Sequence, residues 1–197
     1  MRAVAIGAST GGPQALQAVL AALPGSFPAP VVVVVHIRPS FAASLAARLN
    51  DTSELTVALA EDGEPLAAGK VLVAPPHHHM VVRKAAREVR VLLRDTEPVH
   101  GSRPAVDPLF DSVSRVYGRR SIGVILTGMG VDGCDGAKAV HSRGGRVLAQ
   151  DEASSVVWGM PKAVADAGVA DVVVPLARVA HEICTAVGLS LTPRKAG

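Results

Sequence analysis

The stretch VVVVVHIRPS, residues 31–40, begins with five consecutive valines and continues directly into His36. A strand with one face in water alternates apolar and polar residues, so an unbroken β-branched run indicates a strand buried on both faces. Strands of this kind are typical of parallel sheets that are covered by helices on both sides. The segment therefore predicts a central strand of an α/β protein.

Short apolar runs of the same kind recur along the chain, and helical patterns separate them. The predicted strands cover residues 3–6, 31–35, 71–74, 122–126, 146–149 and 171–174. The predicted helices cover residues 13–23, 41–49, 107–117, 134–142, 160–167 and 176–187. Residues 80–83 and 89–93 flank a short charged turn, which indicates an antiparallel hairpin. This order predicts a doubly wound, three-layer α/β sandwich, Rossmann-like, with a mostly parallel sheet plus a β-hairpin.

Length and charge limit the possible classes of protein. The chain has 197 residues, of which 49% are hydrophobic and 19% charged, so a disordered or low-complexity protein is excluded. We expect one domain over residues 1–190 and a flexible tail over residues 191–197. The net charge of +3 comes without a basic run, and nucleic acid is not an expected partner.

The cysteines and the first residues predict the compartment. Cys134 and Cys184 form no C-x-x-C motif, which fits a reducing environment better than a disulfide framework or a zinc module. The chain starts in a strand-like segment without the features of a signal peptide, and no apolar stretch is long enough to cross a membrane. We expect a cytoplasmic protein without membrane insertion.

The first predicted strand runs into GASTGGP, residues 7–13, and a helical pattern follows at once. The embedded G-x-S-x-G places Ser9 on a tight strand-to-helix turn near unpaired helix N–H groups, and this setting suits a nucleophile. A dinucleotide-binding fingerprint would need glycine at position 9, where this chain has serine. It would also need an acidic residue about 20 positions further on, which is missing because the second strand ends at His36. The alternative that Ser9 or Thr10 only caps the helix stays open.

Two further strand ends supply residues that would complete a hydrolytic site. His36 follows the valine strand, and Asp132 lies in LTGMGVDG, residues 126–133, after another strand. Because the carboxyl ends of parallel strands share one crevice, we expect Ser9, His36 and Asp132 to act there as nucleophile, base and orienting acid. The glycines beside Met129 allow main-chain N–H groups to face a developing oxyanion. A structural histidine and an Asx turn at Asp132 are the alternatives.

Other polar residues are weaker candidates. The consecutive histidines 77–79 alternate in direction, so no metal site is expected there, and no metal or organic cofactor is needed. We expect His79 to line the crevice and Arg103 to contact a carboxylate, both as substrate-binding residues. The adjacent polar residues 150–152 either reach the crevice or form a solvated loop.

Several of these segments, in this order and spacing, resemble the catalytic domain of the CheB family of chemotaxis protein-glutamate methylesterases. They are IGASTGGPQAL, VVVVVHIRPSFAASLAARLN, VAPPHHHM, RPAVDPLFDSV, GVILTGMGVDGCDG and AQDEASSVVWGMPKAV. The resemblance implies that Ser9, His36 and Asp132 form a catalytic triad, that Thr10 shapes the site, and that the Met129 loop serves the oxyanion. It also implies a mostly parallel, doubly wound domain with a hairpin.

The same resemblance implies an activity and partners. The expected reaction is hydrolysis of γ-glutamyl methyl esters on methylated chemoreceptors, with deamidation of receptor glutamines in many members. Family members usually carry an N-terminal receiver domain, and this chain begins at the catalytic strand, so we expect basal activity without phosphorylation and control by a separate response-regulator or kinase partner. The alternatives are a receptor-binding signalling module without catalysis and a nucleotide-binding protein, the latter disfavoured because the Walker A lysine is missing.

Overall fold

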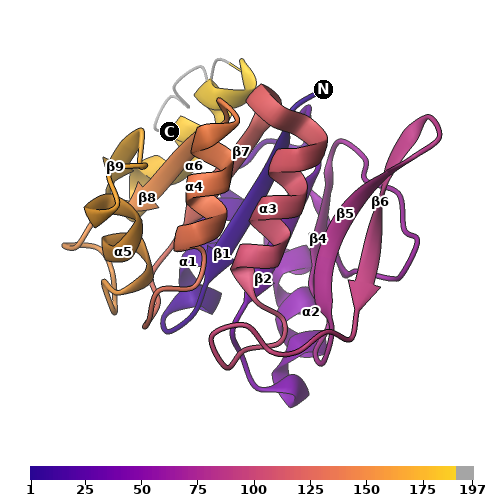
Figure 1. The fold of residues 1–197 in the computed structure, drawn as a ribbon, viewed down its shortest axis with the longest axis horizontal. Coiled ribbons are helices and arrows are strands. Elements are labelled where there is room, and N and C mark those ends of the chain that lie inside the picture. The colour runs from indigo at the N-terminus through magenta and orange to yellow at the C-terminus, as the bar shows by residue number, and fades with distance from the viewer. Residues whose placement is uncertain (190–197) are drawn as a thin grey trace.

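The computed structural model describes residues 1–189, which form a seven-stranded parallel sheet between two layers of helices (Figure 1). The strands are β1 (Ala3–Ala8), β2 (Val31–Val35), β3 (Thr56–Leu59), β4 (Lys70–Val73), β7 (Ser121–Ile125), β8 (Arg146–Gln150) and β9 (Val172–Val174). Their order in the sheet is β3-β4-β2-β1-β7-β8-β9. The predicted fold class is confirmed. The predicted tail, residues 191–197, lies outside the described residues, and the domain boundary at residue 190 stays a prediction.

Helices cover both faces of the sheet. One face carries α1 (Gly12–Ala21), α2 (Ala42–Thr52) and α6 (Leu176–Val187), and the other carries α3 (Val106–Tyr117), α4 (Cys134–Ser142) and α5 (Met160–Asp166) (Figure 1). Two 3-10 turns, η1 (Pro39–Phe41) and η2 (Gly118–Arg120), flank α2 and α3. None of the helices in residues 1–189 combines the length and apolarity needed to cross a bilayer.

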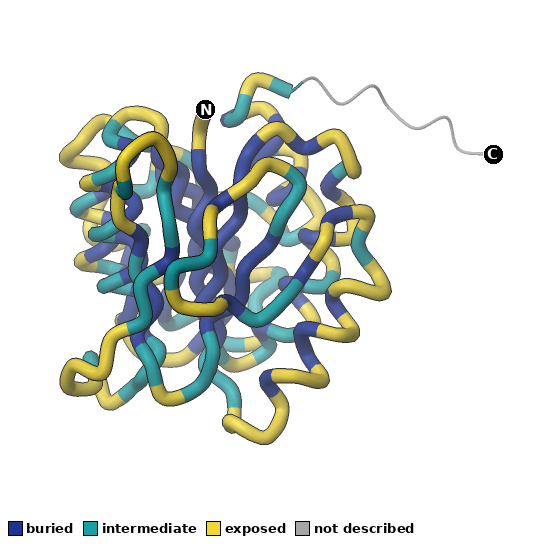
Figure 2. Tube along the Cα trace, turned by 90° about the vertical axis from the view of Figure 1, so that its right-hand side faces the viewer, coloured by how far each residue is buried: buried dark blue, intermediate teal, exposed yellow. Residues whose placement is uncertain are grey.

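The valine run belongs to two hydrophobic cores at once. Val31, Val33 and Val35 pack into the core under α1, α2 and α6. Val32 and Val34 pack into the core under α3, α4 and α5. Successive side chains of a strand point to opposite faces, so each face of β2 needs its own apolar set. Figure 2 shows the resulting buried strands in the middle of the molecule.

The predicted hairpin is confirmed as β5 (His79–Ala85) and β6 (Glu88–Arg94), which pair antiparallel beside α3. The main-chain N–H of Val82 donates to Oγ of Ser112 on α3 at 3.0 Å. Strand β3 was not predicted. It has only four residues at the edge of the sheet, and the first, Thr56, is exposed, so its segment lacks the continuous apolar run of the central strands.

The order of the strands reverses at β1, because β2, β4 and β3 lie on one side of β1 and β7, β8 and β9 lie on the other. This reversal positions the site. β1 pairs with β2 on one side and with β7 on the other. The loops that follow these three strands therefore leave the sheet next to one another at its carboxyl edge. In open α/β sheets this place is where ligands bind.

Candidate active site

Ser9 and His36 lie next to each other at the ends of β1 and β2. Ala8 pairs with Val35 in the last register position, and the N–H of His36 donates to the carbonyl oxygen of Ala8 at 3.0 Å. Gly11, with a φ of 80°, turns the chain from Ser9 into α1. The structure thus brings together the predicted nucleophile and the predicted base.

The β7 side holds Ser9 from the other direction. The N–H of Ser9 donates to the carbonyl oxygen of Thr127 at 3.0 Å. A Cβ at Gly128 would lie 2.8 Å from the Cβ of Ser9, so glycine is needed for this close approach. The backbone of Ser9 is therefore fixed between the ends of β2 and β7.

Asp132 connects His36 to the start of α3. Its Oδ2 accepts a hydrogen bond from Nε2 of His36 at 2.9 Å and another from the N–H of Val106 at 2.7 Å. Its Oδ1 accepts from the N–H of Asp107 at 3.0 Å. The residue is only 2% exposed. Asp132, in the loop after β7, thus caps the start of α3. Nδ1 is the ring nitrogen of His36 that is left for another partner.

These contacts determine the charge of Asp132. Burial acts to raise the pKa of this carboxyl, but the hydrogen bonds from His36, Val106 and Asp107 outweigh burial and hold the pKa below its ordinary value. The carboxylate is therefore ionised at neutral pH. An ionised, fixed carboxylate can hold one tautomer of an imidazole and stabilise the imidazolium.

The loop that carries Met129 is fixed beside Ser9 through Gly128. The N–H of Gly128 donates to the carbonyl oxygen of Val157 at 2.9 Å, and its own carbonyl oxygen accepts from the N–H groups of Gly159 and Met160. The Met129 side chain is 72% exposed and offers no N–H group, so an oxyanion contact would come from the main chain. The roles of Met129 and of the exposed Thr10 stay predictions.

Two buried polar residues lie near Ser9. Thr127 was not predicted as a site residue, and Gln150 was considered only as part of residues 150–152. Oε1 of Gln150 accepts from the N–H of Thr127 at 2.8 Å. Oγ1 of Thr127 donates to the carbonyl oxygen of Thr10 at 2.9 Å and accepts from the N–H of Val157 at 3.0 Å. Thr127 and Gln150 are 1% and 0% exposed, so Gln150 belongs to neither a solvated loop nor the crevice surface. A polar residue directly after a buried strand was the available signal.

We expect Thr127→Val to lower kcat for the predicted ester hydrolysis by roughly 10-fold to 100-fold with little change in KM, because a small displacement of catalytic groups is costly. Valine keeps the shape of threonine but removes the hydroxyl that joins the loops after β1, β7 and β8. Thr127→Ser keeps the hydroxyl and is the matched control, which should restore most of kcat. Steady-state kinetics on the predicted substrate, a glutamyl methyl ester, measures both constants. An unchanged kcat in Thr127→Val would contradict a positioning role.

His79 and Arg103 hold the loop that leads into α3. His79 is 1% exposed, its Nε2 contacts the carbonyl oxygen of Glu97 at 3.0 Å, and its Nδ1 accepts from the N–H of Ala105 at 3.2 Å. The structure does not support the predicted substrate contact of His79, because both ring nitrogens are bound to backbone. Nη1 of Arg103 donates to the carbonyl oxygen of Thr96 at 3.0 Å. A substrate contact of the half-buried Arg103 stays a prediction.

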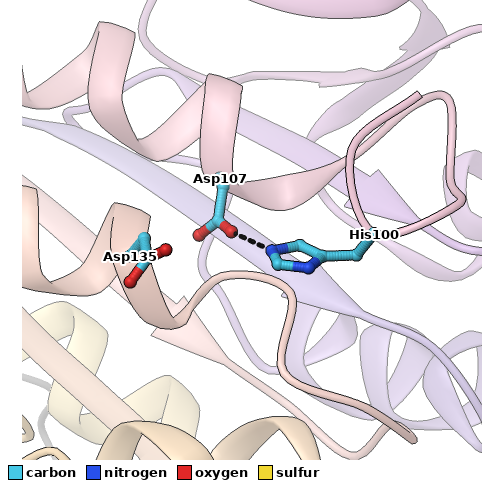
Figure 3. A group of neighbouring side chains, drawn as sticks. All are labelled: His100, Asp107 and Asp135. Atoms are coloured by element: carbon cyan, nitrogen blue, oxygen red, sulfur yellow. Dashed lines mark hydrogen bonds and ion pairs between the residues drawn. The ribbon is translucent and has the colours of Figure 1, made fainter. Parts of the chain in front are cut away.

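A group with metal-ligating atoms lies beside the start of α3 (Figure 3). The ligand atoms of His100, Asp107 and Asp135 all lie within 4.8 Å of one another. Asp107 already contacts Nε2 of His100 at 2.9 Å and accepts from the N–H of Gly136 at 2.7 Å, and Asp135 contacts Nζ of Lys138 at 2.8 Å. These bonds account for the group without a metal ion. In the described part of the chain, the consecutive histidines 77–79 do not form such a group.

The fold and these contacts define a doubly wound α/β protein with a serine, a histidine and a buried aspartate at the carboxyl edge of its sheet. Residues 4–183 match the family model described as CheB methylesterase, and the chain belongs to this family.

Named relatives and a solved structure agree with this assignment. The protein-glutamate methylesterase/protein-glutamine glutaminase of Trichodesmium erythraeum is 45% identical over 94% of this chain and 53% of its own length. The protein of the same name from Archaeoglobus fulgidus is 46% identical over 97% of this chain and 55% of its own length. The chain thus spans about half the length of these relatives. The crystal structure of the Thermotoga maritima CheB methylesterase catalytic domain matches with a TM-score of 0.92 and 44% identity, over 93% of this chain and 97% of that one.

Proposed function

We propose that this chain hydrolyses γ-glutamyl methyl esters on chemoreceptors and releases methanol. The observation that carries the proposal is the hydrogen bond between His36 and the buried, ionised Asp132, directly beside Ser9. Membership of the CheB methylesterase family supports the reaction class.

In the proposed mechanism, Oγ of Ser9 attacks the ester carbonyl while Nδ1 of His36 takes the hydroxyl proton. Nε2–H of His36 stays bonded to Asp132, which stabilises the imidazolium. Main-chain N–H groups near Met129 stabilise the tetrahedral oxyanion. The C–O bond to the leaving group then breaks, and methanol leaves with the proton from His36. Water attacks the acyl-enzyme with the same histidine as base, so glutamate and free Ser9 are restored.

The same groups would deamidate a receptor glutamine. An amide gives the same acyl-enzyme with ammonia as the leaving group, and the relatives' names include a protein-glutamine glutaminase activity. We place both reactions in the cytoplasm, because Cys134 and Cys184 are free thiols, which fits a reducing compartment. Regulation by a separate response-regulator or kinase partner belongs to the same proposal.

The purified chain should release labelled methanol from receptor membranes that carry methyl-labelled glutamyl esters. Parallel samples with a receptor glutamine substrate test for ammonia. If the chain bound these receptors but released neither product, a non-catalytic signalling module would replace this proposal.

A further inference from the structure

Two helices beside the candidate active site cap each other's first turn. Asp132, in the loop before α4, accepts the N–H groups of Val106 and Asp107 at the start of α3, at 2.7 and 3.0 Å. Asp107, in the first turn of α3, accepts the N–H of Gly136 in the first turn of α4 at 2.7 Å. The first N–H groups of a helix have no partner within the helix, so each carboxylate pairs groups that need an outside acceptor.

Close packing of α3 on α4 makes this exchange possible. A Cβ at Gly136 would lie 2.6 Å from the Cβ of Phe110 and 3.1 Å from the Cα of Asp107, so a larger residue would push the two helices apart. The side chain of Asp107 is 12% exposed, and its second oxygen contacts Nε2 of His100 at 2.9 Å (Figure 3). Asp107 is therefore held through both oxygens, between α4 and the loop before α3.

The charge of Asp107 is linked to that of Asp132. Burial raises the pKa of Asp107 above its ordinary value, the hydrogen bond from Gly136 acts against this rise, and the negative charge of Asp132 adds to it. The titratable groups around Asp107 are His100 from the loop before α3, Asp132 from the loop after β7, and Cys134, Asp135 and Lys138 from α4. The negative charge near His36 thus depends on both Asp132 and Asp107.

We propose that Asp107 is a positioning residue of the candidate active site, which caps α4 and so holds the loop before α4 where Asp132 meets His36. This inference rests on the function proposed above and adds a residue that does not touch the substrate. Gly136 lies only four positions after Asp132, so fixing the N–H of Gly136 also fixes the loop that carries the acid. Without this bond, the loop loses a contact that joins it to α3, and Asp132 shifts relative to His36.

The test compares Asp107→Ala with Asp107→Asn. Asparagine keeps a carbonyl oxygen for the N–H of Gly136 and an amide for His100, whereas alanine removes both contacts. We expect Asp107→Ala to lower kcat on N-acetyl glutamate γ-methyl ester by about 10-fold to 100-fold with little change in KM, because a small displacement of catalytic groups is costly. Asp107→Asn should restore most of kcat. Initial rates of methanol release give both constants.

Asp111→Ala is the matched control. Asp111 lies one turn further along α3 and pairs with Arg115 at 2.8 Å, and within residues 1–189 no hydrogen bond or ion pair joins its side chain to Ser9, His36 or Asp132. This variant should keep the kcat of the unmodified protein. Loss of one helix cap is small against the stability of a domain, so Asp107→Ala should stay folded, and thermal unfolding checks this. Equal losses of kcat in Asp107→Ala and Asp107→Asn, or no loss in Asp107→Ala, would overturn the inference.

The pH profile is a readout that a merely structural role would not move. Both variants of Asp107 remove negative charge near the imidazolium of His36, and a displaced Asp132 removes more. The acid limb of kcat/KM should therefore move to lower pH in Asp107→Asn and further in Asp107→Ala, while it stays in place in Asp111→Ala. An acid limb in Asp107→Ala that matches the unmodified protein would show that Asp132 has not moved, and this result would also overturn the inference.

Proton NMR separates the positioning role from the proposed activity, because it needs no turnover. A ring N–H that donates to a carboxylate forms a strong hydrogen bond and resonates at low field. The resonance of His36, assigned by its loss in His36→Ala, should be present in the unmodified protein, Asp107→Asn and Asp111→Ala, and weakened or lost in Asp107→Ala. This pattern without methanol release would support the positioning role and reject the proposed hydrolysis. Absence of the resonance from the unmodified protein, or its full retention in Asp107→Ala, would reject the positioning role.

Discussion

Ser9→Ala should lower ester hydrolysis by on the order of 10³-fold or more, because the variant has no hydroxyl to form the acyl-enzyme. The structure gives a reason to expect an unchanged fold: Ser9 is held by main-chain bonds to Thr127 and Gly12, which alanine retains. The measurement is initial-rate methanol release, with thermal unfolding recorded for both proteins.

His36→Ala should cause a loss of similar size, and the double variant Ser9→Ala/His36→Ala should lose little beyond either single change. Nucleophile and base act as one unit, so their effects do not add. Additive losses would mean that the two residues work independently. Near-normal turnover in Ser9→Ala would show that the nucleophile is a different group.

The arrangement of the central strands could be predicted from the sequence because both of their faces are buried. Val31–Val35 has no polar position, and this leaves few alternatives to a parallel sheet with helices on both sides. Edge strand β3 contains exposed and half-buried residues, and such a short mixed segment carries no comparable signal. Hydrophobic periodicity thus identifies central elements better than peripheral ones.

The pairing of Ser9 with His36 could also be predicted, because both follow strands and strand ends in a parallel sheet meet at one edge. The hydrogen bonds of Thr127 and Gln150 could not, because they join loops that are distant in sequence and follow no period. For His79 the sequence suggested a site contact that the structure does not support. Its position after a strand suggested the crevice, but the loop before α3 covers it and uses both ring nitrogens.

Asp132→Asn should reduce turnover by up to about 10⁴-fold, because the change removes the charge that stabilises the imidazolium and can fix the wrong tautomer. In the present geometry Nε2–H of His36 donates to Oδ2, and Nδ1 is free to take a proton. An amide NH₂ at the Oδ2 position would instead donate to Nε2 and place the proton on Nδ1. Rotating the amide by half a turn would restore the tautomer. In either orientation the NH₂ group faces a main-chain N–H, that of Val106 at the Oδ2 position and that of Asp107 at the Oδ1 position.

Asp132→Asn should also change how stability depends on pH. Measuring stability serves as the control for the turnover measurement. The folded pKa of Asp132 lies below the ordinary value, so its carboxylate stabilises the fold above the unfolded pKa, near 4, and this contribution is lost as pH falls through the folded pKa. We expect Asn to lower the free energy of unfolding by roughly 1 to 3 kcal/mol at neutral pH, with the difference shrinking below about pH 4. Denaturant titrations at neutral and acidic pH measure this difference, while methanol release measures turnover in the folded variant. Normal turnover in the folded variant would show that another acid orients His36. Asp151→Asn would then be the next variant to measure.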